Sequence, residues 1–178
     1  GAIFNQGVIN AIENEVFSGN TAVADGGAIY NLGEIGSIIG EFTGNTASGI
    51  NYDSYINSSG RGGAIFNYGG KVITGGEDSY LSSTIDSIGG KFENNSANLD
   101  GGAIYNAGEI GTIGGTYTNN TAQNGKGGAI YNTNSGGDGY TPPEGDEEGL
   151  KFGEIDTITG TYTGNSAAEG GGAVYNNG

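Results

Sequence analysis

Apolar residues recur along this chain in short runs of fixed spacing, separated by glycine, asparagine, serine and aspartate. The segment GGAIYN stands at residues 26–31 and returns, with at most one letter changed, at 62–67, 101–106, 127–132 and 171–176, while GAIFN opens the chain. Between these segments lie Ile-x-x-Ile (9–12, 35–38, 85–88, 110–113, 155–158) and an aromatic-x-x-Asn motif (17–20, 42–45, 92–95, 117–120, 162–165). Short runs rich in Ile, Phe, Tyr and Thr between turn residues predict strands, and the spacing shows no helical period.

The three motifs form a repeating unit of about 26 residues, the distance from Gly1 to Gly27 and again from Gly102 to Gly128. Longer spacings elsewhere indicate insertions at residues 48–61, 68–83 and 133–152. Each insertion falls between motifs and not inside one, so we expect it to leave at a corner of the unit.

Strands of four to six residues cannot bury themselves alone, so each unit must stack on the next. If equivalent strands pair in parallel, the rest of the unit supplies the long crossover that parallel pairing requires. The sequence therefore predicts an all-β protein: a parallel β-helix of about six coils, with residues 1–178 as one solenoid.

The order of residues in GGAIYN suggests a role for each one. The glycine pair predicts a tight corner, and Ile29 is expected to point inward. Alternation then predicts that Ala28 and Tyr30 point outward, with the aromatic residues forming a stripe. Asn31 and its equivalents are expected at a turn, where asparagine tolerates the left-handed region, and to hydrogen-bond along the stack. We predict two such asparagine ladders, one of Asn5, Asn31, Asn67, Asn106, Asn132 and Asn176, the other of Asn20, Asn45, Asn95, Asn120 and Asn165.

Composition narrows the range of functions. Five basic residues against 20 acidic ones give a net charge of −15, which disfavours nucleic acid and anionic lipid as partners. The chain has no cysteine and no histidine, which excludes disulfides, thiolate zinc sites and histidine catalysis. No apolar run approaches the ~20 residues of a membrane span, so direct membrane insertion is not expected.

One acidic loop offers a candidate metal site. Oxygen ligands for Ca²⁺ are gathered there by Asp138, Glu144, Asp146, Glu147 and Glu148. A solvated acidic loop explains the same residues and is the interpretation we favour. No other cofactor is expected.

Paired carboxylates raise an enzymatic alternative, because glycosidases use two of them. Asp86 and Asp156, or the acids of the loop, could supply such a pair in a polysaccharide-binding or polysaccharide-cleaving β-helix. Glu109 and Glu154 occupy equivalent positions on consecutive units and should either splay apart or share a cation. The basic residues are scattered over separate units, so we expect no enzymatic activity.

The alternation of GGAI with aromatic-x-x-Asn resembles the polymorphic outer-membrane-protein repeats of autotransporter passengers and adhesin-like surface proteins. The resemblance covers essentially the whole chain. It implies a right-handed parallel β-helix, export to the cell surface or extracellular space, and a role in adhesion or display.

Taken together, the sequence predicts a structural and adhesive segment of a longer, exported, surface-displayed or filament-forming repeat protein. The expected partners are the chain itself, through end-to-end stacking or continuation, and host-surface or glycan ligands.

Overall fold

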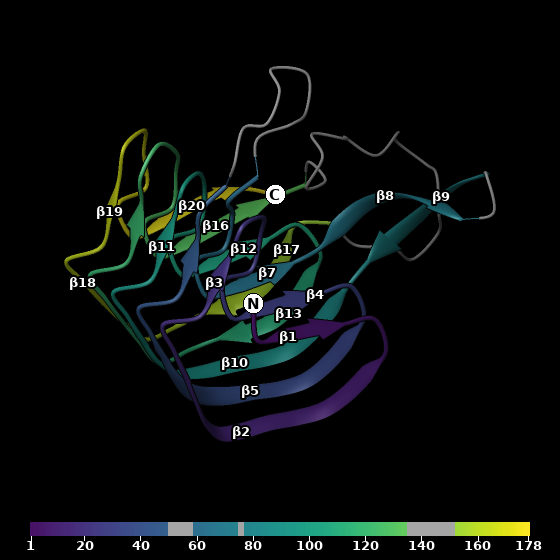
Figure 1. The fold of residues 1–178 in the computed structure, drawn as a ribbon, viewed down its shortest axis with the longest axis horizontal. Coiled ribbons are helices and arrows are strands. Elements are labelled where there is room, and N and C mark those ends of the chain that lie inside the picture. Colours follow the sequence, from purple (N-terminus) through teal and green to yellow (C-terminus); the bar gives the residue numbers. More distant parts are fainter. Residues whose placement is uncertain (50–58, 75–76, 135–151) are drawn as a thin grey trace.

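The computed structural model describes residues 1–49, 59–74, 77–134 and 152–178, and the side chains of residues 71–79 lie outside the description. The described chain folds as a parallel β-helix in which three strand positions recur in every coil (Figure 1). The predicted architecture is confirmed. Among these residues there is no helix that could cross a membrane.

Sheet A contains the Ile-aromatic-Asn segments and is parallel throughout. Its strands, in spatial order, are β1 (Ile3–Asn5), β4 (Ile29–Asn31), β7 (Ile65–Asn67), β12 (Ile104–Asn106), β16 (Ile130–Thr133) and β20 (Val174–Asn177). The register is that of the sequence repeat, with Ile29 opposite Ile65 and Ile65 opposite Ile104.

Sheet B contains the Ile-x-x-Ile and aromatic-x-x-Asn motifs, and sheet C the short segment after each such asparagine. Sheet B consists of β2 (Val8–Ser18), β5 (Glu34–Thr43), β10 (Thr84–Glu93), β13 (Glu109–Ile113), β14 (Thr116–Thr118), β17 (Glu154–Ile158) and β18 (Thr161–Thr163). Sheet C consists of β3 (Thr21–Ala22), β6 (Thr46–Ala47), β11 (Ser96–Ala97), β15 (Thr121–Ala122) and β19 (Ser166–Ala167). The described chain thus makes five full coils followed by the last strand of sheet A.

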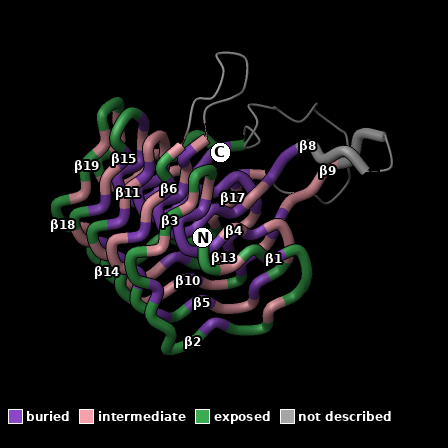
Figure 2. The backbone as a smooth tube through the Cα atoms, in the orientation of Figure 1, coloured by how far each residue is buried: buried purple, intermediate pink, exposed green. Residues whose placement is uncertain are grey.

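Side chains from sheets A and B form one continuous core along the axis. Figure 2 colours the buried residues of the coils purple. Ile29, Ile65, Ile104 and Ile130 are all fully buried in this core. A column of stacked rings runs through the same core, from Phe17 through Phe42, Phe92 and Tyr117 to Tyr162, with centroids 4.6–4.9 Å apart. This spacing matches the ~4.8 Å between paired strands, so each ring stacks on its equivalent in the next coil.

Two asparagine ladders lie at the two ends of sheet B, one where sheet A ends and one where sheet C begins, and they contain the predicted residues. In the first, each Nδ2 donates to the Oδ1 one coil further on, from Asn5 to Asn31 at 2.8 Å through to Asn132 and Asn176 at 2.7 Å. The second ladder runs in the same direction from Asn20 to Asn165. The ladders satisfy amide groups that would otherwise be buried without partners.

The expected backbone conformation of these asparagines was wrong. Positive φ occurs at Asn14, Asn94 and Asn119, and none of these is a ladder residue. In the second motif it is the preceding residue that turns the chain: Gly19, Gly44, Asn94, Asn119 and Gly164 have φ between 56° and 64°. Only glycine and asparagine occupy this corner because they adopt the left-handed region at low cost.

The two glycines of each pair have different tasks. Gly26 has φ +67°, which favours glycine, whereas Gly27 has an ordinary φ but lies against the carbonyl of Gly63 in the next coil. A Cβ on Gly27 would overlap that backbone, so the second glycine allows coils to approach closely.

The predicted outward orientation of Ala28 was also wrong. Ala28 is fully buried in the main core together with Ile29. The N–H groups of Ala28 and Ile29 both donate to the carbonyl of Ala64, at 2.9 Å each. Two successive donors to one carbonyl interrupt the strand alternation, so neighbouring residues face the same side.

The insertion at 68–83 forms an antiparallel hairpin of β8 (Gly69–Thr74) and β9 (Glu77–Ser82), which projects from the coils (Figure 1). Its base is closed by a 2.9 Å hydrogen bond from the N–H of Ser83 to the carbonyl of Tyr68. The insertions at 48–61 and 133–152 leave at corners as well, and most of their residues lie outside the described chain.

We predict that Asn95→Ala destabilises the protein by about 3 kcal/mol, because Asn95 is fully buried and its side chain makes several hydrogen bonds. Its Oδ1 accepts from Asn45, and its Nδ2 donates to Asn120 Oδ1 and to the carbonyl of Phe42. Urea unfolding measures the effect. The matched control is Asn94→Gly, since Asn94 is exposed and other coils have glycine there. Equal losses in the two variants would show that the ladder contributes nothing.

We predict that Tyr117→Phe stabilises the fold by about 1 kcal/mol, because the buried Tyr117 hydroxyl has no hydrogen-bond partner within the described chain. Phenylalanine already occupies this position at Phe42 and Phe92. Tyr162→Phe is the control, since the Tyr162 hydroxyl donates to the carbonyl of Thr159 at 3.1 Å. Removing this satisfied hydroxyl should not increase the free energy of unfolding. A destabilised Tyr117→Phe protein would contradict this interpretation.

Candidate functional site

The outer face of sheet B has most of the described acidic side chains. They stand half-exposed or exposed along the strands: Glu13, Glu15, Glu34, Glu41, Asp86, Glu93, Glu109, Glu154 and Asp156. Lys91 is the one described basic residue on this face. The face therefore has a strongly negative potential.

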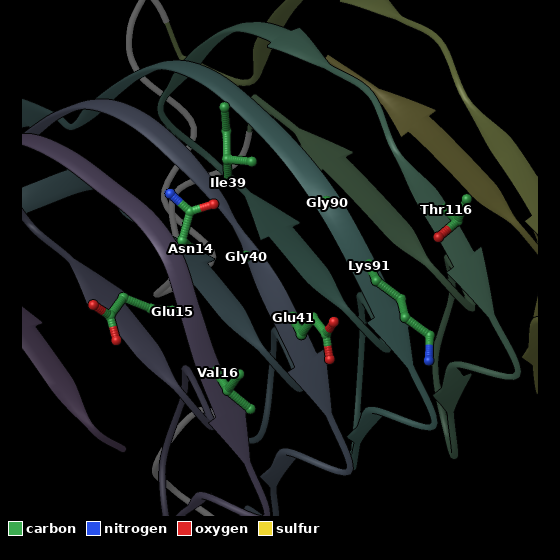
Figure 3. Close-up of a pocket in the computed structure, with 9 residues that line it drawn as sticks. All are labelled: Asn14, Glu15, Val16, Ile39, Gly40, Glu41, Gly90, Lys91 and Thr116. Carbon is green, nitrogen blue, oxygen red and sulfur yellow. The ribbon is translucent and has the colours of Figure 1, made fainter.

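A shallow groove of about 440 Å³ crosses this face where β2, β5 and β10 bend (Figure 3). Its floor is backbone, because Gly40 and Gly90 lie in register there. A side chain at Gly90 would overlap the Gly40 carbonyl, and its φ is +102°. Exposed Val16 and Ile39 give the groove an apolar wall.

The charged groups of the groove are two acids, Glu15 and Glu41, and Lys91. Lys91 Nζ lies 2.6 Å from the Glu93 carboxylate, and this contact raises the pKa of Lys91. Glu15 and Glu41 are exposed. A catalytic carboxylic acid needs an environment that holds its proton near neutral pH, and an open face provides no such desolvation.

The other candidate acid pairs lie on the same open face. Asp86 and Asp156 both align with Gly111, one on each side, so two coil steps of ~4.8 Å separate them. Both are exposed. Glu109 and Glu154 are direct register neighbours, as the repeat implied. The described residues contain no group of three or more ligands placed to hold a metal ion.

The candidate calcium ligands Asp138, Glu144, Asp146, Glu147 and Glu148 lie outside the described residues. The calcium site therefore stays a prediction.

The predicted aromatic stripe is present on the outer side of sheet A. Rings stack from Phe4 through Tyr30, Phe66, Tyr105 and Tyr131 to Tyr175, with centroids 4.8–5.4 Å apart. Phe66 and Tyr105 are nevertheless buried, and with Ala107 they form a second apolar cluster. The rings from Phe66 to Tyr175 are stacked face to face, whereas the contacts of Tyr30 with Phe4 and with Phe66 are tilted by 32° and 31°.

Sequence reasoning missed a column of charges beside this stripe. The residue before each glycine pair is Asp25, Arg61, Asp100 and Lys126 in successive coils. An alignment of the repeats shows the alternation, which no single unit contains. Burial raises the pKa of Asp25 and of Asp100, although Arg61 opposes the shift at both.

Three stretches of the chain, residues 16–32, 90–107 and 118–133, match the family model of the Chlamydia polymorphic membrane protein repeat. Each stretch runs from the second asparagine ladder, through sheet C and the glycine pair, to the first ladder. These three matches make up less than a third of the chain's 178 residues. Comparisons with curated proteins and with solved structures gave no significant match.

The polymorphic membrane protein repeat thus corresponds to the part of the coil that fixes stacking. The matched stretches contain ladder asparagines and glycine pairs. The groove residues of β5 fall outside them, whereas Val16, Gly90 and Lys91 fall inside. The match supports a surface-exposed repeat protein of the autotransporter type.

We predict that stability falls as the pH rises above about 4. The folded-state pKa values of Asp25 and Asp100 lie above the ordinary 3.8, so their contribution is complete below that value and is lost as they ionise. Urea unfolding between pH 4 and pH 7 should show this slope, and Asp25→Asn/Asp100→Asn should reduce it. An unchanged slope in the double variant would exclude these two carboxyls as its source.

Proposed function

We propose that this β-helix is the rigid shaft of an exported surface protein and that its corner insertions present the adhesive surface. One observation carries the proposal. The core and both asparagine ladders pass through every coil without a break, although insertions leave between coils at three corners.

Rigidity follows from the way the coils are joined. Each coil contacts its neighbours through three parallel sheets, two ladders and two ring columns. A segment can bend only by opening several of these at once, so the coils act as a single stiff unit. Loops on such a scaffold keep a defined position, which suits recognition.

The stacking of the coils does not depend on the insertions. Tyr68 and Ser83, at the base of the hairpin, are joined by a hydrogen bond and correspond to the adjacent residues Leu32 and Gly33 of the preceding coil. The hairpin is therefore dispensable for stacking, and its presence calls for another role. We place binding of host-surface glycans there and at the neighbouring insertions.

A polysaccharide-cleaving role has weaker support. The groove on sheet B is open, and its acids Glu15 and Glu41 are exposed. Two carboxylates on a flat face lack the differing environments that assign acid and base. We propose that the protein is not an enzyme and contains no cofactor beyond the candidate calcium ion in the loop at 133–152.

The end faces are the second proposed interaction surface. The coil of β1, β2 and β3 leaves Phe4 61% exposed and has an apolar hollow lined by Ile3, Ile12 and Phe17. Unpaired parallel strands accept a further strand readily. We propose that a coil of the same repeat, from this chain or a second copy, stacks there.

The adhesive role is tested by deleting the insertions and keeping the coils. Removing residues 49–59, 69–82 and 134–152 joins corner residues that other coils join directly. We expect the deletion protein to retain its β-sheet circular dichroism and to unfold within about 1 kcal/mol of the parent, because long surface loops add little to stability. Binding to an immobilised glycan array should be lost.

Glu41→Gln/Lys91→Gln is the control, since both side chains line the groove on sheet B. It should bind the array like the parent. Binding that survives deletion of all three insertions, or that disappears in the groove variant, would overturn the assignment to the corners.

A further inference from the structure

The charged residues before the glycine pairs lie directly above one another at the corner between sheets C and A. The N–H of Gly26 donates to the carbonyl of Arg61, that of Gly62 to Asp100, and that of Gly101 to Lys126, all at 3.0 Å. In the fifth coil Gly170 takes the position, and the adjacent Glu169 places its carboxylate 3.7 Å from Lys126 Nζ. The sign therefore alternates through all five coils: Asp25, Arg61, Asp100, Lys126 and Glu169. We call these five residues the corner column.

Each of the first four members contacts the following coil. Asp25 Oδ1 accepts the N–H groups of Gly60 and Arg61 at 2.8 Å, and Asp100 Oδ1 accepts that of Lys126 at 2.8 Å. The side chains of Arg61 and Lys126 also contact the following coil. The guanidinium of Arg61 lies 5.6 Å from the Tyr105 ring centroid, and Lys126 Nζ lies 5.0 Å from that of Tyr175.

Stability alone does not explain the column. Desolvation is the largest influence on both aspartates and raises the pKa of each, so their ionised forms are less favourable in the fold than in water. Partly buried groups of opposite charge often add little net stability, yet removing or reversing one of them is costly. Such an arrangement destabilises the stacking of a coil on a wrong coil more strongly than it stabilises stacking on the correct one.

The remaining contacts between coils do not distinguish the correct neighbouring coil from another coil. The inward isoleucine, the ladder asparagines and the stacked rings are nearly the same in each coil, so a coil would fit almost equally well on a coil other than its neighbour. If the Asp25 coil stacked directly on the Asp100 coil, without the Arg61 coil between them, two carboxylates would lie together at one partly buried corner.

We propose that the corner column determines which coils stack on one another, by requiring opposite charges at this corner in adjacent coils. A repeat protein with near-identical coils thereby keeps them in chain order. By the same rule, a coil that docks against the Asp25 coil must carry lysine or arginine at this position.

The test compares Arg61→Glu with Arg61→Gln, because both remove the cation but only the first places three carboxylates in succession. We expect the unfolding equilibrium constant of Arg61→Glu to exceed that of Arg61→Gln by about tenfold at low salt. In about 1 M NaCl, where the Debye length is ~3 Å, the gap should narrow to about twofold. Thr161→Glu adds a carboxylate outside the column, opposite the uncharged Thr116, and should differ little from the parent.

Hydrogen exchange locates the effect. The amides of residues 26–31 bond to the Arg61 coil, so Arg61→Glu should exchange there several-fold faster than Arg61→Gln, while residues 127–132 stay protected. Lys126→Glu and Lys126→Gln, between Asp100 and Glu169, repeat the comparison at a second site if Arg61→Glu fails to fold. Glutamate and glutamine variants with equal stability, equal salt dependence and equal exchange would overturn the proposal.

Discussion

Every feature of this protein depends on the in-register hydrogen bonding of one coil to the next. Parallel strands of two to eleven residues have no stability alone, and they persist because each N–H and C=O bonds to the neighbouring coil about 4.8 Å away. That constraint makes each position of the coil a column of like residues. Identical side chains in a column must therefore interact favourably at that spacing. The residue types of the repeat do so: isoleucines pack on one another, aromatic rings stack, asparagine amides hydrogen-bond to the next asparagine, and glycines allow the backbones to approach closely.

The same constraint separates structure from recognition. The stretches that match the polymorphic membrane protein repeat are those that join the two ladders, so the family signature is a signature of stacking. Most of the outer face of sheet B and the three insertions lie outside the matched stretches, and there the sequence varies from coil to coil. Acidic side chains accumulate on that face, and whole loops are added at the corners, without disturbing the columns.

Much of this could be predicted from the sequence, because a repeat places equivalent residues in equivalent environments. The ladders and the isoleucine column follow directly from Asn31 and Ile29. Ala28 could not be placed by alternation, since two successive N–H groups share the Ala64 carbonyl and interrupt the pleat. The hairpin at 68–83 did have a signal, two short β-prone runs around a Gly-Gly pair, which we treated only as an insertion. The corner column also requires comparison between coils, because its alternation is invisible within any single one.

Disulfide cross-linking of paired cysteines tests the in-register stacking most directly, because the natural chain contains no cysteine. Thr21 and Thr46 are register neighbours on β3 and β6, and Ser96 follows Thr46 on β11. The variant Thr21→Cys/Thr46→Cys should form a disulfide readily under mild oxidation, because neighbouring strands lie within the 4.4–6.8 Å Cα range of such bonds. The variant Thr21→Cys/Ser96→Cys should remain reduced, since two coil steps of ~4.8 Å separate its residues. Cross-linking in the second variant, or its absence in the first, would contradict the stacked-coil structure.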